Sequence, residues 1–214
     1  MNILTLSNSI RLKSNLKLLL LLSILFTFSC KKKELQILGV PTIQDSQTIY
    51  PVIPEFEYFN QDSQRISLQS LGYNIHIASF FFTSCPTICP KVMRSMSRIA
   101  DLFADKNNIS YLCFSLDSKR DSIPRLKEYY DKVGLNNKNF HLLRGIDMND
   151  SKKLAQHYLS TASEDPEAAG GINHSGWILL VDKNRHLRSY ADGTNTEDVD
   201  RFIGDIKILL NEKN

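Results

Sequence analysis

Two cysteines, Cys85 and Cys89, lie four positions apart and are the residues of this sequence best suited to chemistry. They belong to the stretch FFFTSCPTICPKVM, in which an apolar run precedes them and a proline follows each of them. Two thiols at this spacing could form a disulfide, act as a redox couple, or bind a soft metal ion. The rest of the chain must decide among these three kinds of site.

The two prolines indicate where the cysteines lie relative to secondary structure. A residue that precedes proline favours extended backbone, so neither cysteine is expected inside a helix. Pro90 suits the first helical position, which predicts a helix from Pro90 to about Ala104 with Cys89 at or near its N-cap. The helix dipole and the free N–H groups at that end favour the thiolate, the form that attacks disulfides and binds metals.

The elements that must position this pair alternate between strands and helices. The stretch 56–71 predicts a hairpin with a turn at 60–64. After it we expect strands at 74–82, 109–117, 140–145, 176–182 and 185–192, and helices at 90–104, 121–134, 149–159 and 195–212. We expect Asn149 or Asp150 to cap the third of these helices, and Asn195 or Thr196 the last. This order predicts an α/β, thioredoxin-like fold, with a central mixed sheet, helices on both faces and an extra N-terminal β-hairpin.

A metal ion shared by the two sulfurs would need a further ligand. With metal–sulfur bonds of about 2.3 Å, the sulfurs must lie within about 4.6 Å of each other, which the three-residue loop permits. His174 lies in GGINHSG, a glycine-rich segment that leads into the buried strand WILLVD. In a thioredoxin-like fold this segment lies beside the helix N-terminus that carries the cysteines, which favours His174 as their partner.

The remaining histidines and thiols have simpler interpretations. His76 and His141 lie in predicted strands and are expected to be hydrogen-bonded core or edge residues. His157 and His186 are expected at the surface. Cys113 lies among apolar residues in the middle of a strand, where we expect it to fill the core.

The N-terminus has the pattern of an export signal. Residues 1–29 contain a basic stretch and the apolar run LLLLLSILFTF, too short for a membrane span, and Cys30 follows. This pattern resembles a bacterial lipoprotein signal in which Cys30 is acylated, and a short signal-anchor helix is the alternative. We therefore expect a signal peptide at 1–29, a tether at 30–53 and a domain at 54–214, held at a membrane outside the cytoplasm, in the bacterial periplasm.

Charge argues against one class of partner. The formal net charge of +3 comes from the N-terminal bases, and the chain from residue 30 onward carries 23 basic and 23 acidic side chains. A balanced domain of this kind gives no reason to expect nucleic-acid binding.

Four stretches together resemble the Sco/SenC family of copper-binding, thioredoxin-like proteins. They are the cysteine segment FFFTSCPTICPKVMRSM, the acidic turn and helix FSLDSKRDSIPRLKEYYDKVG, the histidine segment NHSGWILLVDKNRHLRSYADG, and the opening hairpin with the first central strand. They cover most of the chain from residue 54 to residue 208. Ser118 stands where the family commonly has proline.

The resemblance implies a function and a set of site residues. It implies binding of copper, as Cu(I) or Cu(II), by Cys85, Cys89 and His174, and an acidic position at Asp117 near the metal. It also implies delivery of copper to the copper-bearing subunit of cytochrome c oxidase. Asp117 could equally cap the turn into the next helix. A thiol–disulfide oxidoreductase that acts on partner cysteines through Cys85 and Cys89 is the alternative function, so the sequence does not decide whether the protein is an enzyme.

Overall fold

A seven-stranded mixed sheet forms the centre of the protein. The computed structural model describes residues 33–212, and the chain from Glu34 onward forms one compact unit. The strand order in the sheet is β11-β10-β5-β6-β7-β3-β4. The strands of this sheet are β3 (Glu57–Asn60), β4 (Arg65–Ser67), β5 (Ile75–Phe81), β6 (Ile109–Ser115), β7 (Phe140–Arg144), β10 (Trp177–Val181) and β11 (Leu187–Asp192).

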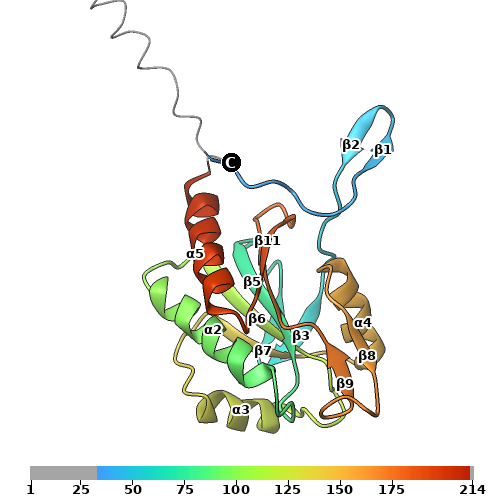
Figure 1. Ribbon diagram of the computed structural model, residues 1–214, viewed down its shortest axis with the longest axis vertical. Helices are drawn as coiled ribbons and strands as arrows, with labels where there is room; N and C mark the ends of the chain where they lie inside the picture. Colours follow the sequence, from blue (N-terminus) through green and yellow to red (C-terminus); the bar gives the residue numbers. More distant parts are fainter. Residues whose placement is uncertain (1–32, 213–214) are drawn as a thin grey trace, which may run out of the picture. The chain divides into compact units, whose positions relative to one another are not determined.

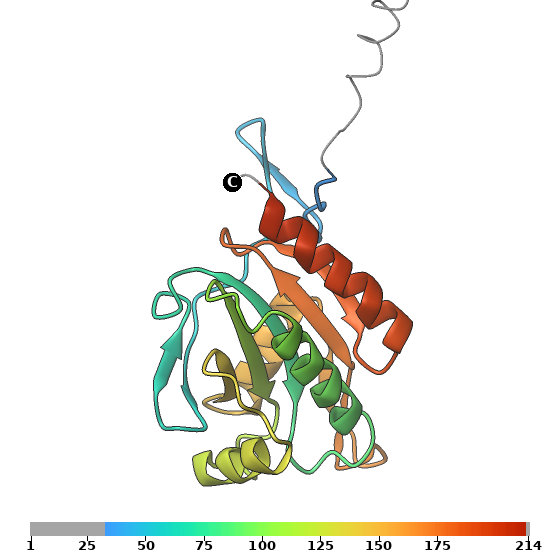
Figure 2. The same ribbon diagram turned by 90° about the vertical axis from the view of Figure 1, so that its left-hand side faces the viewer.

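The three central strands run parallel and the outer strands antiparallel. β6 pairs in parallel with both β5 and β7, whereas β10 pairs antiparallel with β5, and β3 with β7. Figures 1 and 2 show α2 (Cys89–Leu102), α3 (Ile123–Lys132) and α5 (Thr196–Asn211) on one face of the sheet, and α4 (Met148–His157) on the other. Strands covered on both faces need apolar side chains along their whole length, and every residue of β6 is buried.

The structure confirms the predicted fold and the order of its elements. The predicted N-terminal hairpin is β3 and β4, and it extends the sheet beyond β7. Two further two-stranded pairs lie outside this sheet. They are β1 (Thr42–Gln44) with β2 (Gln47–Ile49), and β8 (Ala162–Glu164) with β9 (Ile172–His174). The first pair lies in the expected tether, and its six strand residues are all exposed, so they carry no alternation that would predict it.

The start of the described chain is bound to the domain. Arg188, which is buried, donates to the carbonyl groups of Leu35 and Gln36 and forms ion pairs with Asp182 (2.9 Å) and Glu212 (2.7 Å). The N–H of Leu35 donates to the Glu212 carboxylate at 2.7 Å. This part of the expected tether is therefore bound to the start of β11 and to the C-terminal end of α5.

Helix ends follow the predictions with one correction. Asn195 caps α5 as predicted, and Gly134, with a φ of 70°, follows the end of α3. The prediction for α4 was wrong, because Asp147 is its N-cap and accepts a hydrogen bond from the N–H of Asp150. Asp150 itself lies in the first turn, where its negative charge is also favourable.

The expected signal peptide and the acylation site Cys30 lie outside the described residues. Among residues 33–212, none of the helices combines the length and the apolar character that crossing a bilayer requires.

Candidate metal centre

The cysteine loop begins at the end of the central strand β5. Phe82, directly after the strand, is buried, and its carbonyl accepts a hydrogen bond from the N–H of Cys85 at 3.1 Å. The carboxylate of Asp121 accepts hydrogen bonds from the hydroxyl of Thr83 at 2.6 Å and from its N–H at 3.2 Å. Ser115 at the end of β6 donates to the same carboxylate at 2.6 Å. Asp121 therefore joins the cysteine loop to the neighbouring strand.

Cys89 is the first residue of α2, one position later in the helix than predicted. Ile88 is the N-cap residue, with helical dihedral angles and no side-chain cap, and its carbonyl accepts from the N–H groups of Lys91 and Val92. A residue that precedes proline is biased towards extended backbone. It can still be the first residue of a helix, because the N–H groups of the first turn have no intrahelical partner. Both cysteines remain at the positive end of α2, as expected, and both are buried.

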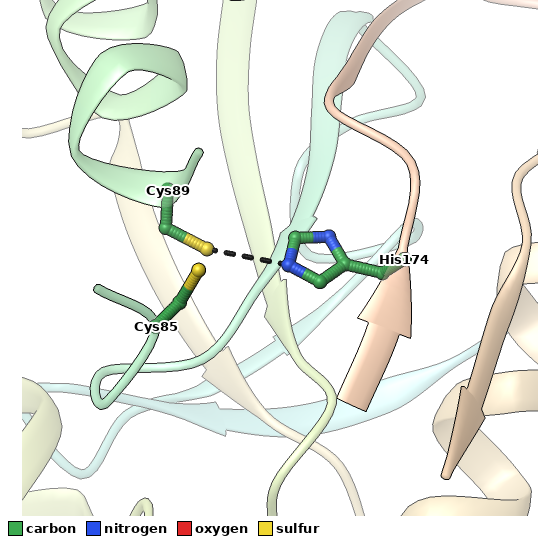
Figure 3. Close-up of side chains that lie close together, drawn as sticks. All are labelled: Cys85, Cys89 and His174. Atoms are coloured by element: carbon green, nitrogen blue, oxygen red, sulfur yellow. Dashed lines mark hydrogen bonds between the residues drawn. The ribbon is translucent and has the colours of Figure 1, made fainter. Parts of the chain in front are cut away.

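The β8–β9 hairpin brings His174 to the two sulfurs. His174 is the last residue of β9, and its Nε2 atom lies 3.5 Å from Sγ of Cys89 (Figure 3). The two sulfurs and the imidazole nitrogen all lie within 4.8 Å of one another. Of the described residues, these three form the cluster of possible metal ligands, and they come from segments 85 residues apart in the chain.

The hydrogen bond on the far side of the imidazole determines which nitrogen can bind a metal. Nδ1 of His174 lies 3.0 Å from the carbonyl oxygen of Ser175. A carbonyl only accepts, so Nδ1 carries the proton and, in the neutral ring, Nε2 keeps its lone pair towards the sulfurs. The ring of Phe82 packs edge-on against the imidazole, with the centroids 5.4 Å apart.

The two thiols have different proton affinities. A hydrogen bond from the Cys89 side chain, with a smaller contribution from the N–H of Cys89, holds the pKa of Cys85 well below the ordinary thiol value against the effect of burial. The same hydrogen bond, together with burial, raises the pKa of Cys89. The reduced pair therefore holds one thiolate, on Cys85, and one thiol, on Cys89, whereas the helix dipole alone predicted that both would favour the thiolate.

Asp117 lies outside this cluster and forms an ion pair. Its buried carboxylate accepts from the guanidinium of Arg120 and from the N–H of Arg120. The N–H of Asp121 donates to the carbonyl of Asp117 at 2.8 Å, which closes the turn before α3. Asp117 therefore closes the turn before α3, and a role for it near a bound metal stays a prediction.

Three of the other histidines and Cys113 lie where the sequence predicted, whereas His186, expected at the surface, does not. His76 and His141 are buried and hydrogen-bonded, and His157 is exposed on α4. His186 is partly buried, and its ring packs edge-on against Tyr50. Cys113 is fully buried, and burial raises the pKa of its thiol.

Sequence reasoning missed the residues that support the cluster. Asp121 was interpreted only as the start of a helix, although it anchors Thr83 in the cysteine loop. Its chain position next to a strand end was visible, but nothing in the pattern shows that the carboxylate turns inward. The Ser175 carbonyl is a backbone atom, and the side-chain pattern carries no signal for it.

Comparison with known proteins identifies similar chains. A model of the SCO1/SenC family matches residues 44–211. The SCO1 protein homolog of Bacillus subtilis is 28% identical over 159 residues, which cover 74% of this chain and 82% of the relative.

Two solved structures share the fold. BsSco, described as a member of the Sco family of cytochrome c oxidase assembly proteins, matches with a TM-score of 0.66 and 24% identity, over 83% of this chain and 100% of that chain. Yeast Sco1 with copper bound matches with a TM-score of 0.58 and 21% identity, over 73% of this chain and 88% of that chain.

Proposed function

The chain belongs to the SCO1/SenC family, and from that premise we propose that it is a copper chaperone whose metal ligands are Cys85, Cys89 and His174. The observation that carries this proposal is the buried cluster in which an imidazole nitrogen with a free lone pair faces two sulfurs. Thiolate and imidazole donors suit Cu(I) and Cu(II) better than hard cations. The copper-bound yeast relative has the same fold.

Each ligand has a distinct task in taking up the ion. Cys85 already carries the negative charge, because the hydrogen bond from Cys89 lowers its pKa. Cys89 must release its proton on binding, and His174 must stay neutral so that Nε2 can donate its lone pair. Copper affinity therefore falls as the pH falls and protons compete for these atoms.

The copper ion is cargo in this proposal, and transfer depends on how few ligands hold it. Three protein ligands leave room for a thiolate of the partner to bind before Cys85, Cys89 or His174 is released. The ion then passes from one protein to the other by exchange of ligands, and it is never free in solution. The partner is the copper-bearing subunit of cytochrome c oxidase or another extracytoplasmic protein with copper-binding thiols.

In this role the domain lies at a membrane surface outside the cytoplasm. A signal peptide at 1–29 and a lipid on Cys30 would hold it there, and the bases at 31–33 would lie next to the headgroups. The arrangement suits a chaperone that serves a membrane-bound oxidase.

Copper titration of the domain from Glu34 onward tests the proposal. The reduced wild-type domain is expected to bind about one copper ion, and Cys85→Ser, Cys89→Ser and His174→Ala are each expected to weaken binding strongly. His157→Ala is the matched control, since it removes an exposed imidazole on α4. Unchanged copper affinity in the three site variants would overturn the assignment.

The thiolate on Cys85 also favours a second function, thiol–disulfide exchange. Sγ of Cys85 would attack a disulfide of the partner, and Cys89 would then displace the partner's sulfur. The partner's disulfide gains two electrons and two protons, and Cys85 and Cys89 become a disulfide. His174→Ala separates the two functions in cells, because copper binding needs the imidazole and exchange does not.

A further inference from the structure

The hairpin that carries His174 is held apart from the main sheet. β8 and β9 pair only with each other among the described strands. At its base, the hydroxyls of Ser160 and Ser175 lie 2.6 Å apart, and the N–H of Ser175 donates to the Thr161 carbonyl. Inside the tip, residues 165–171, the N–H of Asp165 donates to the Gly171 carbonyl. His174 lies at the base, opposite Ala162, so the contacts of the base and those of the tip together set how closely its imidazole approaches the cysteines.

One side chain connects the tip to the body of the protein. Nη2 of Arg120 donates to the carbonyl oxygen of Gly170 at 2.8 Å, and Nε of the same guanidinium donates to Asp117. Within residues 33–212 this is the hydrogen bond that joins the tip to residues outside the hairpin. The Asp117 side chain is 4% exposed and that of Arg120 is 53% exposed, so a buried anion holds a cation at the surface.

The tip also packs directly on the cysteine loop. Gly170 has a φ of +83°, and a Cβ atom placed on it would lie 2.6 Å from the ring of Phe82 and 3.4 Å from the carbonyl oxygen of Ser84. The ring of Phe82 also packs against the imidazole of His174. Phe82 thus touches both the tip and the ligand histidine. The tip can lie this close to the Phe82 ring because residue 170 is a glycine without a Cβ atom.

We propose that Arg120, held by Asp117, is a positioning residue that fastens the Gly170 tip onto Phe82 and thereby keeps His174 at the two cysteines. Releasing the tip lets the hairpin pivot about its hydrogen-bonded base and removes the support of Phe82, so that the imidazole shifts away from Cys85 and Cys89, which stay in place. The strength of this fastening sets how tightly the third ligand binds, and hence how easily copper is passed on. The inference rests on the proposed function for its role in copper transfer, but its geometry can be tested without copper.

Two adjacent glycines provide a matched pair of variants. Gly170 and Gly171 have nearly the same positive φ, +83° and +84°, so an alanine at either position adopts the same unfavourable backbone conformation. A Cβ at Gly171 meets nothing within 4 Å, whereas a Cβ at Gly170 collides with Phe82. Gly170→Ala should therefore lift the tip, and Gly171→Ala should leave it in place.

Arg120→Ala releases the same tip in a different way, because it removes the donor of the hydrogen bond to the Gly170 carbonyl. Its control is Arg65→Ala, which removes an exposed guanidinium that pairs with Glu57 on the β3–β4 hairpin. Arg65 pairs with an exposed carboxylate, so Arg65→Ala should leave stability unchanged, whereas Arg120→Ala leaves the buried Asp117 carboxylate without its cation and should lower the unfolding midpoint.

The first measurement is made on the reduced protein without metal. In wild type, Gly171→Ala and Arg65→Ala, NMR should detect a nuclear Overhauser contact between the rings of His174 and Phe82. In Gly170→Ala and Arg120→Ala we expect this contact to be lost while the domain stays folded. A merely structural role for Arg120 would lower the midpoint and keep the contact, which would overturn the inference.

The second measurement is Cu(I) affinity by competition with a chromophoric chelator. We expect Gly170→Ala and Arg120→Ala to weaken binding by about 10-fold to 100-fold, the usual effect of losing a residue that orients a metal ligand. In the Cu(II) form, both variants should lose the nitrogen hyperfine lines in the electron paramagnetic resonance spectrum. Wild-type affinity and spectra in both would refute the inference, whereas a wild-type domain that binds no copper would refute the proposed function alone.

Discussion

Acidification should destabilise this protein through His141, whose surroundings accept only the neutral ring. His141 is buried, and its Nδ1 atom lies 3.3 Å from the side-chain nitrogen of Asn60. The Asn60 side-chain oxygen already accepts the N–H groups of Asp62 and Gln64, so the amide N–H₂ must face the imidazole. Nδ1 is therefore an acceptor, and protonation would set two donors against each other.

The size of the effect follows from the shift in pKa. Burial lowers the pKa of His141 from 6.5 to about 4. The neutral ring stabilises the fold fully above pH 6.5, and this contribution is lost as the pH falls towards 4, because the unfolded chain binds the proton first. Between pH 7 and pH 4.5 the loss is roughly 2 to 3 kcal/mol. Burial lowers the pKa of His76 to about 4 as well, so the two histidines together lose about 5 kcal/mol of a typical total of 5–15 kcal/mol.

Urea unfolding of the reduced, metal-free domain at pH 7 and pH 4.5 measures this loss. His141→Gln keeps a group that can accept from Asn60 but cannot be protonated in this range. The difference in unfolding free energy between wild type and this variant should change by roughly 2 to 3 kcal/mol in favour of the variant at the lower pH. Comparing the two proteins cancels Asp121, whose pKa is raised by burial and which acts in the opposite direction on acidification.

His157→Gln is the matched control, because it makes the same substitution at an exposed imidazole on α4. A direct check is the NMR titration of the imidazole protons, in which His141 should stay neutral from pH 8 to pH 5. An ordinary titration of His141 near pH 6.5, or identical pH dependence in wild type and His141→Gln, would show that the argument from burial is wrong.

Three further predictions concern the thiols and the N-terminal segment. At about pH 6, iodoacetamide should modify Cys85 first, because its pKa is lowered by Cys89, and Cys89→Ala should slow that reaction in a mass-spectrometric time course. Cys113 should stay unmodified until the protein unfolds, and Cys113→Ala should cost about 1 kcal/mol in urea unfolding while copper binding stays at the wild-type level. Removing residues 33–38 should destabilise the domain by about 3 kcal/mol, since Arg188 loses the carbonyl groups that it binds, and equal stability of the shortened chain would contradict that role.

Much of the fold could be predicted from local patterns. The continuous apolar run of β5 and β6 indicates strands covered on both faces, and the period of α2 indicates a helix with one buried side. These signals are strong because a buried helix or strand needs apolar side chains at the same positions in every helical turn or every pair of strand residues. The hairpins β1–β2 and β8–β9 were not predicted, since strands of three residues that lie apart from the sheet show no such repetition.

The candidate site, like the fold, could be predicted from the sequence only in part. The sequence by itself determined that Cys85 and Cys89 lie together at the start of a helix, because proline acts on its immediate neighbours, and it made His174 a candidate third ligand. Only the tertiary structure decided that Nε2 of His174 faces the sulfurs, that Cys85 holds the negative charge, and that Asp117 pairs with Arg120. Each of these depends on distances of a few ångströms between segments far apart in the chain. Electrostatic and hydrogen-bond energies change steeply over such distances, and residue type and spacing do not specify them.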